Sequence, residues 1–317
     1  MCVDYMDAEE YKRHLEYEKE HFDSRTYRPD LTEKSPTALI YLLHRFQSRV
    51  RSRVGSTVWD YLVSVVNNKI KGDTSGPVKI LSVGSGPGGA EMNMAHKFVG
   101  SNYDMECIDI NENLLSMGQT KADKEGLKLK FIQQDINSIS LSADYYDVIF
   151  AHASLHHMVN HEHIASEINK SMKPNAEFIV YDIITRNGMR MWDETREIAN
   201  KVFSLLPLKF RCYSLARNQE EKYLAELPDR DLSTTGFECI RSQDLYPILK
   251  KSFKVKLEVE GFSFARRFFD QEFGDNYDVD RNPFDKAIAD TIIGLDEEYQ
   301  SRHHLKPESI FLVLERR

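Results

Sequence analysis

The sequence predicts an α/β fold built on a doubly wound parallel sheet with helices on both faces. From residue 78 onward, short apolar runs alternate with amphipathic stretches at the spacing of successive strand and helix units. A glycine-rich loop directly follows the first apolar run, as happens where a strand leads into a helix in such sheets. The 317 residues, 41% of them hydrophobic, are enough to bury a sizeable core.

The segment before this pattern, residues 1–75, is predicted to be a helical extension or cap. Tyr11, Leu15 and Phe22 share one face of a helix with 3.6 residues per turn. After Pro36 the same period returns in a second apolar series, formed by Leu39, Leu42, Leu43, Phe46, Val50 and Val54. These residues are expected to form an N-terminal helical layer.

The elements of the sheet domain, residues 76–317, follow in chain order. Strands are expected over residues 78–83, 103–110, 127–133, 147–151, 176–183, 254–262 and 309–317. Helices are expected over residues 91–99, 112–123, 163–172, 242–251 and 282–300. Two insertions, at about 184–236 and 263–306, interrupt the alternation. Long excursions from a compact sheet are usually functional, so we expect substrate specificity to reside there.

The charge of the chain argues against nucleic acid or membrane partners. The sequence has 42 basic and 50 acidic side chains, a formal net charge of −8. A negative chain has no general attraction to phosphate backbones or anionic lipids. No segment has the apolar length that spans a bilayer, and the N-terminus lacks the apolar stretch of a signal peptide.

The four cysteines suit a reducing compartment. Cys2, Cys107, Cys212 and Cys239 are scattered without paired spacing, and two of them lie in apolar segments. This pattern favours neither a disulfide framework nor a zinc site. We therefore expect a cytoplasmic protein.

The glycine-rich loop is the first candidate for a ligand site. It reads "ILSVGSGPGGAEM" over residues 80–92. Glycine lets the backbone turn sharply and approach a ligand without a Cβ atom in the way. Gly84, Gly86 and Gly89 have the spacing of a dinucleotide site, whereas Gly84, Gly86 and Gly88 have the spacing of an S-adenosylmethionine (SAM) site. A tight turn without a ligand is the third interpretation.

Acidic residues end the next two predicted strands. Asp109 lies twenty-five residues after Gly84, where a carboxylate can accept hydrogen bonds from both hydroxyls of a ribose. Asp135 ends the third strand, with Ile136 beside it. A carboxylate there can accept from the exocyclic amine of adenine while the apolar neighbour packs on the ring, or it can simply cap a turn.

Five motifs in this order resemble those of class I SAM-dependent methyltransferases: "ILSVGSGPGG", "CIDIN", "QQDI", "YDVIFAHASLHHM" and "MKPNAEFIVYDI". The resemblance covers about residues 78–183 and, more weakly, the last two strands. It implies a seven-stranded sheet whose last strand is antiparallel, with SAM bound across the strand ends. The implied cofactor-binding residues are Gly84, Ser85, Gly86, Gly88, Asp109, Ile110, Asp135, Ile136, Ala151 and His152. The family often has an acidic residue two positions before the first glycine, where this chain has Ser82.

A histidine-rich stretch follows the fourth strand. His152, His156, His157, His161 and His163 fall within twelve residues. Imidazole is a common metal ligand, but no acidic or cysteine partner accompanies these residues at ligand spacing, so no metal site is predicted.

In methyltransferases that this chain resembles, an "LHH" segment borders the methyl-transfer site. His156 and His157 are therefore candidates for a general base that deprotonates an acceptor hydroxyl. Adjacent helical residues point about 100° apart, so only one of the two is expected to face the acceptor. The alternative is that these histidines cap the following helix or line the pocket.

We therefore expect a SAM-dependent methyltransferase that acts on a small molecule, such as a metabolite or sugar, with O-methylation favoured. The family's motifs for methylating nucleobases are absent. The insertions offer aromatic and cationic groups for a sugar or a carboxylated metabolite, namely Trp192, Arg211, Tyr213, Arg266 and Arg267. An NAD-dependent oxidoreductase and an inactive methyltransferase-like binding protein are the alternatives. The sequence predicts no oligomeric state.

Overall fold

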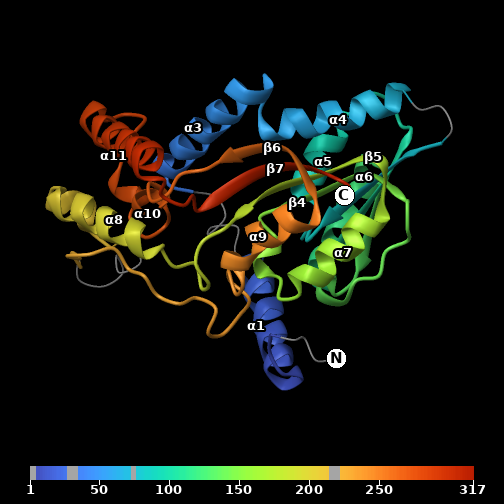
Figure 1. Cartoon of the computed structure of the whole chain (residues 1–317), viewed down its shortest axis with the longest axis horizontal. Coiled ribbons are helices and arrows are strands. Elements are labelled where there is room, and N and C mark those ends of the chain that lie inside the picture. The colour runs from blue at the N-terminus through green and yellow to red at the C-terminus, as the bar shows by residue number, and fades with distance from the viewer. Residues whose placement is uncertain (1–4, 27–34, 73–75, 214–221) are drawn as a thin grey trace.

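A seven-stranded sheet organises the molecule (Figure 1). The computed structural model describes residues 5–26, 35–72, 76–213 and 222–317. The strand order is β3-β2-β1-β4-β5-β7-β6. The strands are β1 Val78–Val83, β2 Tyr103–Asp109, β3 Leu129–Gln133, β4 Tyr146–His152, β5 Met172–Ile183, β6 Lys254–Glu260 and β7 Ser309–Glu315.

The direction of the strands confirms the predicted sheet. β1 to β5 are mutually parallel, and β7 runs antiparallel to both β5 and β6. β1 pairs with β2 on one side and with β4 on the other, so the strand order reverses between β1 and β4. In open α/β sheets, such a reversal leaves a crevice beyond the carboxyl ends of the strands, where ligands bind.

Helices cover both faces of the sheet. The longer ones are α1 Ala8–Thr26, α3 Thr37–Val54, α4 Val58–Gly72, α6 Glu112–Glu125, α7 His161–Ser171, α8 Asp193–Leu205, α9 Ser242–Ser252 and α11 Pro283–His303. The shorter ones are α5 Gly89–Ala95, α10 Arg266–Phe269, and the 3₁₀ turns η1 Ile136–Ser138, η2 Leu155–His157, η3 Leu208–Arg211 and η5 Gly274–Asn276. Among the described helices, none combines the length and apolar character needed to cross a membrane.

The two faces of the sheet bury separate cores because successive side chains of a strand point to opposite sides. In β1, Ile80 joins the core formed with α3, α4 and α5, whereas Leu81 joins the core formed with α7 and α9. The predicted apolar runs therefore form the centre of the sheet.

The N-terminal helices are divided between two places (Figure 1). α3 and α4 contribute Leu42, Phe46 and Leu62 to one core face of the sheet. α1 lies apart from them, next to α6 and the carboxyl ends of the strands. Its apolar face therefore packs near the crevice and not into the main cores.

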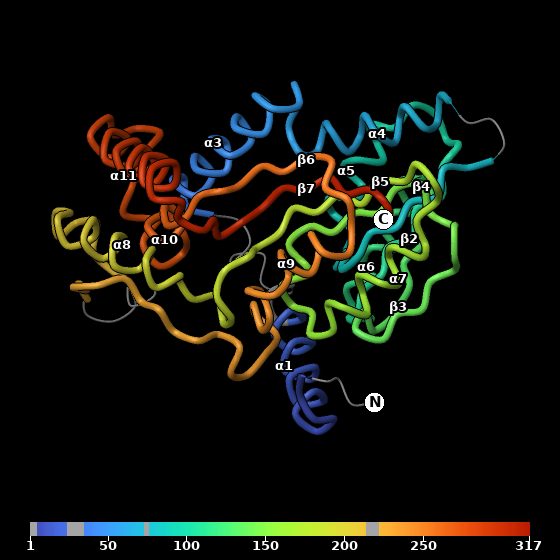
Figure 2. Tube along the Cα trace, in the orientation of Figure 1, coloured from blue at the N-terminus to red at the C-terminus, as the bar shows by residue number. Residues whose placement is uncertain are grey.

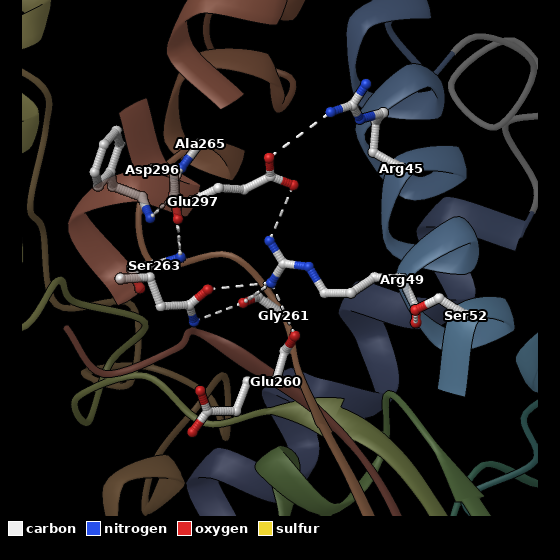
Figure 3. Close-up of polar contacts among 11 residues, drawn as sticks. Arg45, Arg49, Ser52, Glu260, Gly261, Ser263, Ala265, Asp296 and Glu297 are labelled. Carbon is white, nitrogen blue, oxygen red and sulfur yellow. Dashed lines mark hydrogen bonds and ion pairs between the residues drawn. The ribbon is translucent and has the colours of Figure 1, made fainter. Parts of the chain in front are cut away.

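The helices α8, α10 and α11 gather at one end of the molecule beside α3 (Figure 2). Arg49 of α3 fastens them, because its guanidinium donates to the carbonyl oxygens of Glu260 and Gly261 at 3.0 and 2.9 Å (Figure 3). The same guanidinium forms an ion pair of 3.2 Å with Glu297 of α11. One arginine thus joins α3, the end of β6 and α11.

A buried carboxylate fixes the chain that leads into α10 (Figure 3). The backbone N–H groups of Ser263, Phe264 and Ala265 all donate to Asp296, over distances of 2.6 to 3.0 Å. Burial raises the pKa of Asp296 to about 6, although these donors oppose the shift. The start of α10 therefore has a defined position.

Candidate active site

The glycine loop between β1 and α5 is held by the neighbouring strand β2. Gly84 and Ser85 donate their backbone N–H groups to the carbonyl oxygen of Ile108, at 2.9 and 3.1 Å. Gly86 donates its N–H to Asp109 Oδ2 at 2.8 Å. The loop and the carboxylate predicted to bind ribose are therefore one hydrogen-bonded unit.

The glycines of the loop have different roles. Gly84, Gly86 and Gly88 all have positive φ, at 73°, 52° and 70°, where other residues are strained. A Cβ atom on Gly84 would lie 2.4 Å from Ser154, and one on Gly88 would lie 2.4 Å from Phe131. A Cβ atom on Gly86 would meet nothing nearer than 3.9 Å, so the Gly86 backbone faces open space.

That open space is a cavity of about 450 Å³ beyond the strand ends. This volume lies in the usual range for a site that holds a small organic ligand. The cavity is lined by most of the predicted site residues: Gly84, Ser85, Gly86, Asp109, Ile110, Asp135, Ile136, His156 and His157.

Three predicted cofactor-binding residues do not line this cavity. Gly88 is the N-cap of α5, and Phe131 fills the space beside it. Ala151 is buried in the core below the strand ends. His152 points to the other side, where it packs against Trp59 and lines a second cavity. Adjacent residues of β4 alternate between faces, so these two could not both have reached the loop.

Asp109 is arranged to accept further hydrogen bonds. Its Oδ2 accepts from the Gly86 N–H and its Oδ1 accepts from the Asn111 N–H at 2.9 Å. A carboxylate has about four acceptor positions, so about two stay available on the cavity side. Two is the number that the adjacent hydroxyls of a ribose require.

Asp135 is already bound by a residue of α1. Tyr11 Oη donates to the Asp135 carboxylate, 2.9 Å from each oxygen, and the Asn137 N–H donates to Oδ1. Burial raises the pKa of Tyr11, and the charge of Asp135 raises it further, so the phenol stays a neutral donor. Oδ2 keeps room for one more donor, such as an adenine amine.

α1 closes the cavity through several polar contacts. Tyr11, Leu15, Glu18, Lys19 and Phe22 line the cavity. Asp23 accepts from the side-chain amides of Asn111 and Asn113, each at 2.9 Å. The helical face predicted from Tyr11, Leu15 and Phe22 is therefore real, and it faces the candidate site.

His156 forms a buried pair with Asp182 at the end of β5. His156 Nδ1 lies 2.5 Å from Asp182 Oδ1, and both side chains are almost fully buried. The N–H groups of Ser154, Leu155 and Ile183 also donate to Asp182. Burial alone would raise the pKa of Asp182, but His156 and these donors lower it, so the carboxylate is ionised.

The ionised carboxylate fixes the tautomer of His156. A carboxylate only accepts hydrogen bonds, so Nδ1 must carry the proton that lies between the two groups. In the neutral ring, Nε2 then has a free lone pair. His156 lines the cavity, so this nitrogen is suited to take a proton.

His157 is held by two carboxylates. Its Nδ1 lies 2.9 Å from Glu18 Oε1, and its Nε2 lies 3.8 Å from Glu238 Oε2. Burial alone would lower the pKa of His157, but Glu18 and Glu238 raise it above the ordinary value. His157 therefore favours the protonated form more than an isolated histidine does.

Both histidines line the cavity, although the prediction that only one faces the acceptor assumed that they lie on an α-helix. They lie on the 3₁₀ turn η2, and both Nε2 atoms approach Glu238, at 3.8 Å each. Their ring centroids are 4.2 Å apart. A tight turn between a strand and a helix brings both rings to one carboxylate, which the geometry of a regular α-helix would not allow.

Glu238 gives the two histidines an acidic neighbour. The ligand atoms of His156, His157 and Glu238 lie within 4.8 Å of one another, so the three could hold a divalent cation. Glu238 lies about eighty residues away in the chain, so the spacing within the histidine-rich stretch did not indicate it. The predicted absence of a metal stays a prediction.

Ser82 is paired with a buried carboxylate. Ser82 Oγ donates to Glu91 Oε1 of α5 at 2.6 Å, and both residues are buried. Burial raises the pKa of Glu91, and Ser82 opposes this shift. A carboxylate thus lies beside the position where the family often has one, although Glu91 does not line the cavity.

Sequence reasoning missed four residues of the site: Tyr11, Glu18, Asp182 and Glu238. Asp182 follows the rule that located Asp109 and Asp135, because it also ends a parallel strand, so the sequence contained a signal for it. Tyr11, Glu18 and Glu238 reach the site from segments outside the sheet. The helical period marks the face that carries Tyr11 and Glu18, but it does not say that this face meets the strand ends, and no local pattern marks Glu238.

Comparison with known proteins agrees with this geometry. A family model described as a methyltransferase domain matches residues 75–251. The sterol 24-C-methyltransferase ERG6B of Gibberella zeae is 34% identical over 107 residues, which are 33% of this chain and 27% of that protein. The ubiquinone/menaquinone biosynthesis C-methyltransferase UbiE of a Shewanella species is 22% identical over 134 residues, 42% of this chain and 50% of that protein. The chain thus spans half or less of the length of these relatives.

A solved structure is similar along more of the chain. It is a geranyl diphosphate C-methyltransferase from Streptomyces coelicolor A3(2), 12% identical with a TM-score of 0.47, and the alignment covers 88% of this chain and 84% of that one.

Proposed function

Because this chain belongs to the methyltransferase domain family and has the class I SAM-dependent fold, we propose that it methylates a hydroxyl group of a small molecule. SAM carries its methyl group on a sulfonium. When the methyl group is transferred, the sulfur leaves as a neutral thioether, which is a good leaving group. The tasks of the protein are then to bind and orient the two reactants and to remove the proton of the acceptor.

The glycine loop and the strand-end carboxylates support SAM binding in the 450 Å³ cavity. The Gly86 backbone faces the cavity with no side chain in the way. Asp109 would accept from the ribose hydroxyls, and Asp135 with Ile136 would hold the adenine. The observation that carries the cofactor half of the proposal is the Gly86–Asp109 hydrogen bond, because it joins the open loop backbone to a carboxylate that lines the same cavity.

The His156–Asp182 pair supports methylation of an alcohol. A hydroxyl must lose its proton as the methyl group arrives, and His156 Nε2 is an available acceptor on the cavity wall. Asp182 would hold the ring in the correct tautomer and stabilise the imidazolium that forms. His157, held between Glu18 and Glu238, would place a second polar group beside it.

Binding of S-adenosylhomocysteine (SAH) tests the cofactor half of the proposal. We expect SAH to bind to the purified protein in calorimetry with at least micromolar affinity, and NAD to give no heat. Heat from NAD and none from SAH would overturn the cofactor assignment.

Turnover tests the chemical half, with a panel of hydroxylated small molecules and SAM carrying a labelled methyl group. Mass spectrometry then identifies the methylated atom. His156→Gln should lower turnover strongly while SAH affinity stays unchanged. The assay is repeated after treatment with EDTA. Activity that is lost with EDTA and restored by a divalent cation would mean that His156, His157 and Glu238 hold a metal, and general-base catalysis by His156 would be wrong.

A further inference from the structure

A second cavity, of about 610 Å³, lies beside the candidate cofactor cavity. It is bounded by α3, the ends of β4 and β5, and the start of β7. Ala153, Ile183 and Arg266 line both cavities, so the two meet at these residues. A molecule in the second cavity would therefore reach the first one at this junction.

The wall of the second cavity is mainly apolar. Leu39, Leu42 and Phe46 of α3 line one side, and Trp59 and Phe262 contribute aromatic rings. Burial of apolar surface is the main source of binding free energy at such a wall. The body of the ligand should therefore be apolar.

An aromatic series forms the part of the wall nearest the sheet. Tyr181 stacks on Phe46, with centroids 5.1 Å apart and planes at 9°, and on His152, at 5.4 Å and 25°. Trp59 packs edge-on against His152 at 4.6 Å. Burial lowers the pKa of His152, so at neutral pH this ring is uncharged. These rings favour a ligand with a flat apolar body.

The cavity also has a way in from solvent. Ile40 and Leu43 of α3 line it, yet they are 42% and 43% exposed. Large apolar side chains exposed next to a cavity are typical of the entrance to a ligand site.

One charged group at the junction has no hydrogen-bond acceptor. Among the described residues, no hydrogen bond or ion pair within 4.0 Å reaches the Arg266 side chain, and its Nε is buried without an acceptor. At longer range its charge favours the ionised forms of Glu238, Asp270 and Glu308. The next residue, Arg267, is fully compensated, because its guanidinium donates to both oxygens of the buried Glu308. A guanidinium without an acceptor costs free energy, so Arg266 is suited to bind an anion.

The position of Arg266 is fixed by the chain before it. The Asp296 carboxylate holds the backbone of Ser263, Phe264 and Ala265, and Arg266 follows directly. A charged side chain on a fixed backbone loses less entropy when it binds a ligand. This supports a recognition role for Arg266.

The charge around the junction favours a single negative charge. Arg266 is the only lysine or arginine that lines the second cavity within the part of the chain that the structure describes. The two lining carboxylates, Asp182 and Glu308, already accept hydrogen bonds from His156 and Arg267, and neither accepts one from Arg266. One guanidinium without a hydrogen-bond acceptor suits a carboxylate, whereas a diphosphate would need more cationic groups than this lining supplies.

We propose that the second cavity binds the methyl acceptor, and that the acceptor is an apolar monocarboxylate whose carboxylate pairs with Arg266. The inference rests on the proposed function, because it assigns the acceptor to the cavity that meets the cofactor cavity. The reacting hydroxyl then lies near the carboxylate, since Arg266 stands at the junction.

Three related probes test this proposal by binding alone: 1-hydroxy-2-naphthoate, its uncharged carboxamide, and 1-naphthol. Their affinities for the full-length protein are measured by fluorescence titration, with and without saturating SAH. We expect the naphthoate to bind at least about tenfold more tightly than the other two, because only it can form charge-assisted hydrogen bonds.

The variant Arg266→Met should remove this preference, so that all three probes bind equally, while the SAH affinity stays within about twofold of wild type. Arg266→Lys should restore part of it. Arg45→Met is the matched control, since Arg45 is a cation of α3 that does not line the cavity, and its preference should equal that of wild type.

Two results would overturn the proposal. The first is an unchanged naphthoate affinity in Arg266→Met, and the second is failure of all three probes to bind to wild type. A drop in SAH affinity with unchanged naphthoate affinity would instead assign Arg266 to the carboxylate of the cofactor. If wild type fails to bind SAH but keeps the naphthoate preference, the proposed function fails and the carboxylate site stands.

Discussion

Replacing Asp109 by alanine should weaken SAH binding by about 3 kcal/mol, or roughly a hundredfold. Each Asp109 oxygen already accepts one backbone N–H, from Gly86 or Asn111. About one acceptor position is left on each oxygen, so two ribose hydroxyls can donate. A hydrogen bond to a charged group contributes about 1.5 to 3 kcal/mol, and the lower end applies because Asp109 is only partly buried.

Calorimetric titration with SAH measures this loss. Asp104→Ala is the matched control, because Asp104 lies on the same strand but forms an ion pair with Lys79 away from the cavity. That variant should bind SAH within about twofold of wild type. Asp109→Ala also frees two backbone donors, the N–H of Gly86 in the loop and the N–H of Asn111 before α6, so thermal unfolding of each variant must show that the protein is folded.

Equal SAH affinities of the two variants would refute this prediction. If folded Asp109→Ala and Asp104→Ala bind SAH equally well, the carboxylate does not hold the cofactor. The hydrogen bond to Gly86 would then only stabilise the loop.

Three further predictions test the loop, the histidine pair and α1. Gly86→Ala should weaken SAH binding at least about tenfold in calorimetry, because the added methyl group enters the cavity. Gly100→Ala is the control, because Gly100 also has positive φ and nothing lies near its added Cβ. It should lower the free energy of unfolding by only about 1 kcal/mol and leave SAH binding unchanged. Asp182→Asn should lower kcat by about 10²- to 10⁴-fold at unchanged SAH affinity, and nitrogen NMR should show His156 in the other tautomer; an unchanged tautomer would contradict the assignment. Glu18→Gln should lower the free energy of unfolding, and the loss measured in denaturant titrations should be about 1 kcal/mol larger at about pH 5.5 than at about pH 8.5. Glu16→Gln is the control, because Glu16 is exposed on the same helix. The sign follows because the raised pKa of His157 gives stability that is complete below the ordinary value of 6.5 and is lost as the pH rises through the folded value; an equal loss at both pH values would refute it.

The sheet and the loop were predictable because their signals are local. An apolar run, a turn and an amphipathic stretch are read within a few residues, and parallel strands place their carboxyl ends at one edge. This rule predicted Asp109 and Asp135, and both line the cavity at the strand ends. His152 was predicted from the family resemblance and lines the second cavity, because neighbouring residues at the end of β4 alternate between the two faces.

The pairing of Glu18 and Glu238 with the histidines was not predictable, because both carboxylates lie far from them in the chain. Glu18 is 139 residues from His157, and it reaches the site only because α1 crosses the strand ends. Glu238 comes from the end of an insertion whose path is set by packing. A carboxylate on an amphipathic helix usually belongs to a solvated face. The helical period places Glu18, unlike Glu16, on the predicted apolar face, but nothing in the sequence says which residues that face meets.

The way α1 is attached links its stability to the chemistry of the site. The side chains that hold it against the cavity are mostly polar, and their acceptors and donors are site residues: Asp135 for Tyr11, and His157 for Glu18. Apolar burial is not directional, but these contacts require particular atoms at particular angles. A change of charge at His157 or Asp135 therefore alters both the position of α1 and the wall of the cavity. For this reason both the free energy of unfolding and the SAH affinity should be measured for Glu18→Gln. A purely structural contact would change only the free energy of unfolding.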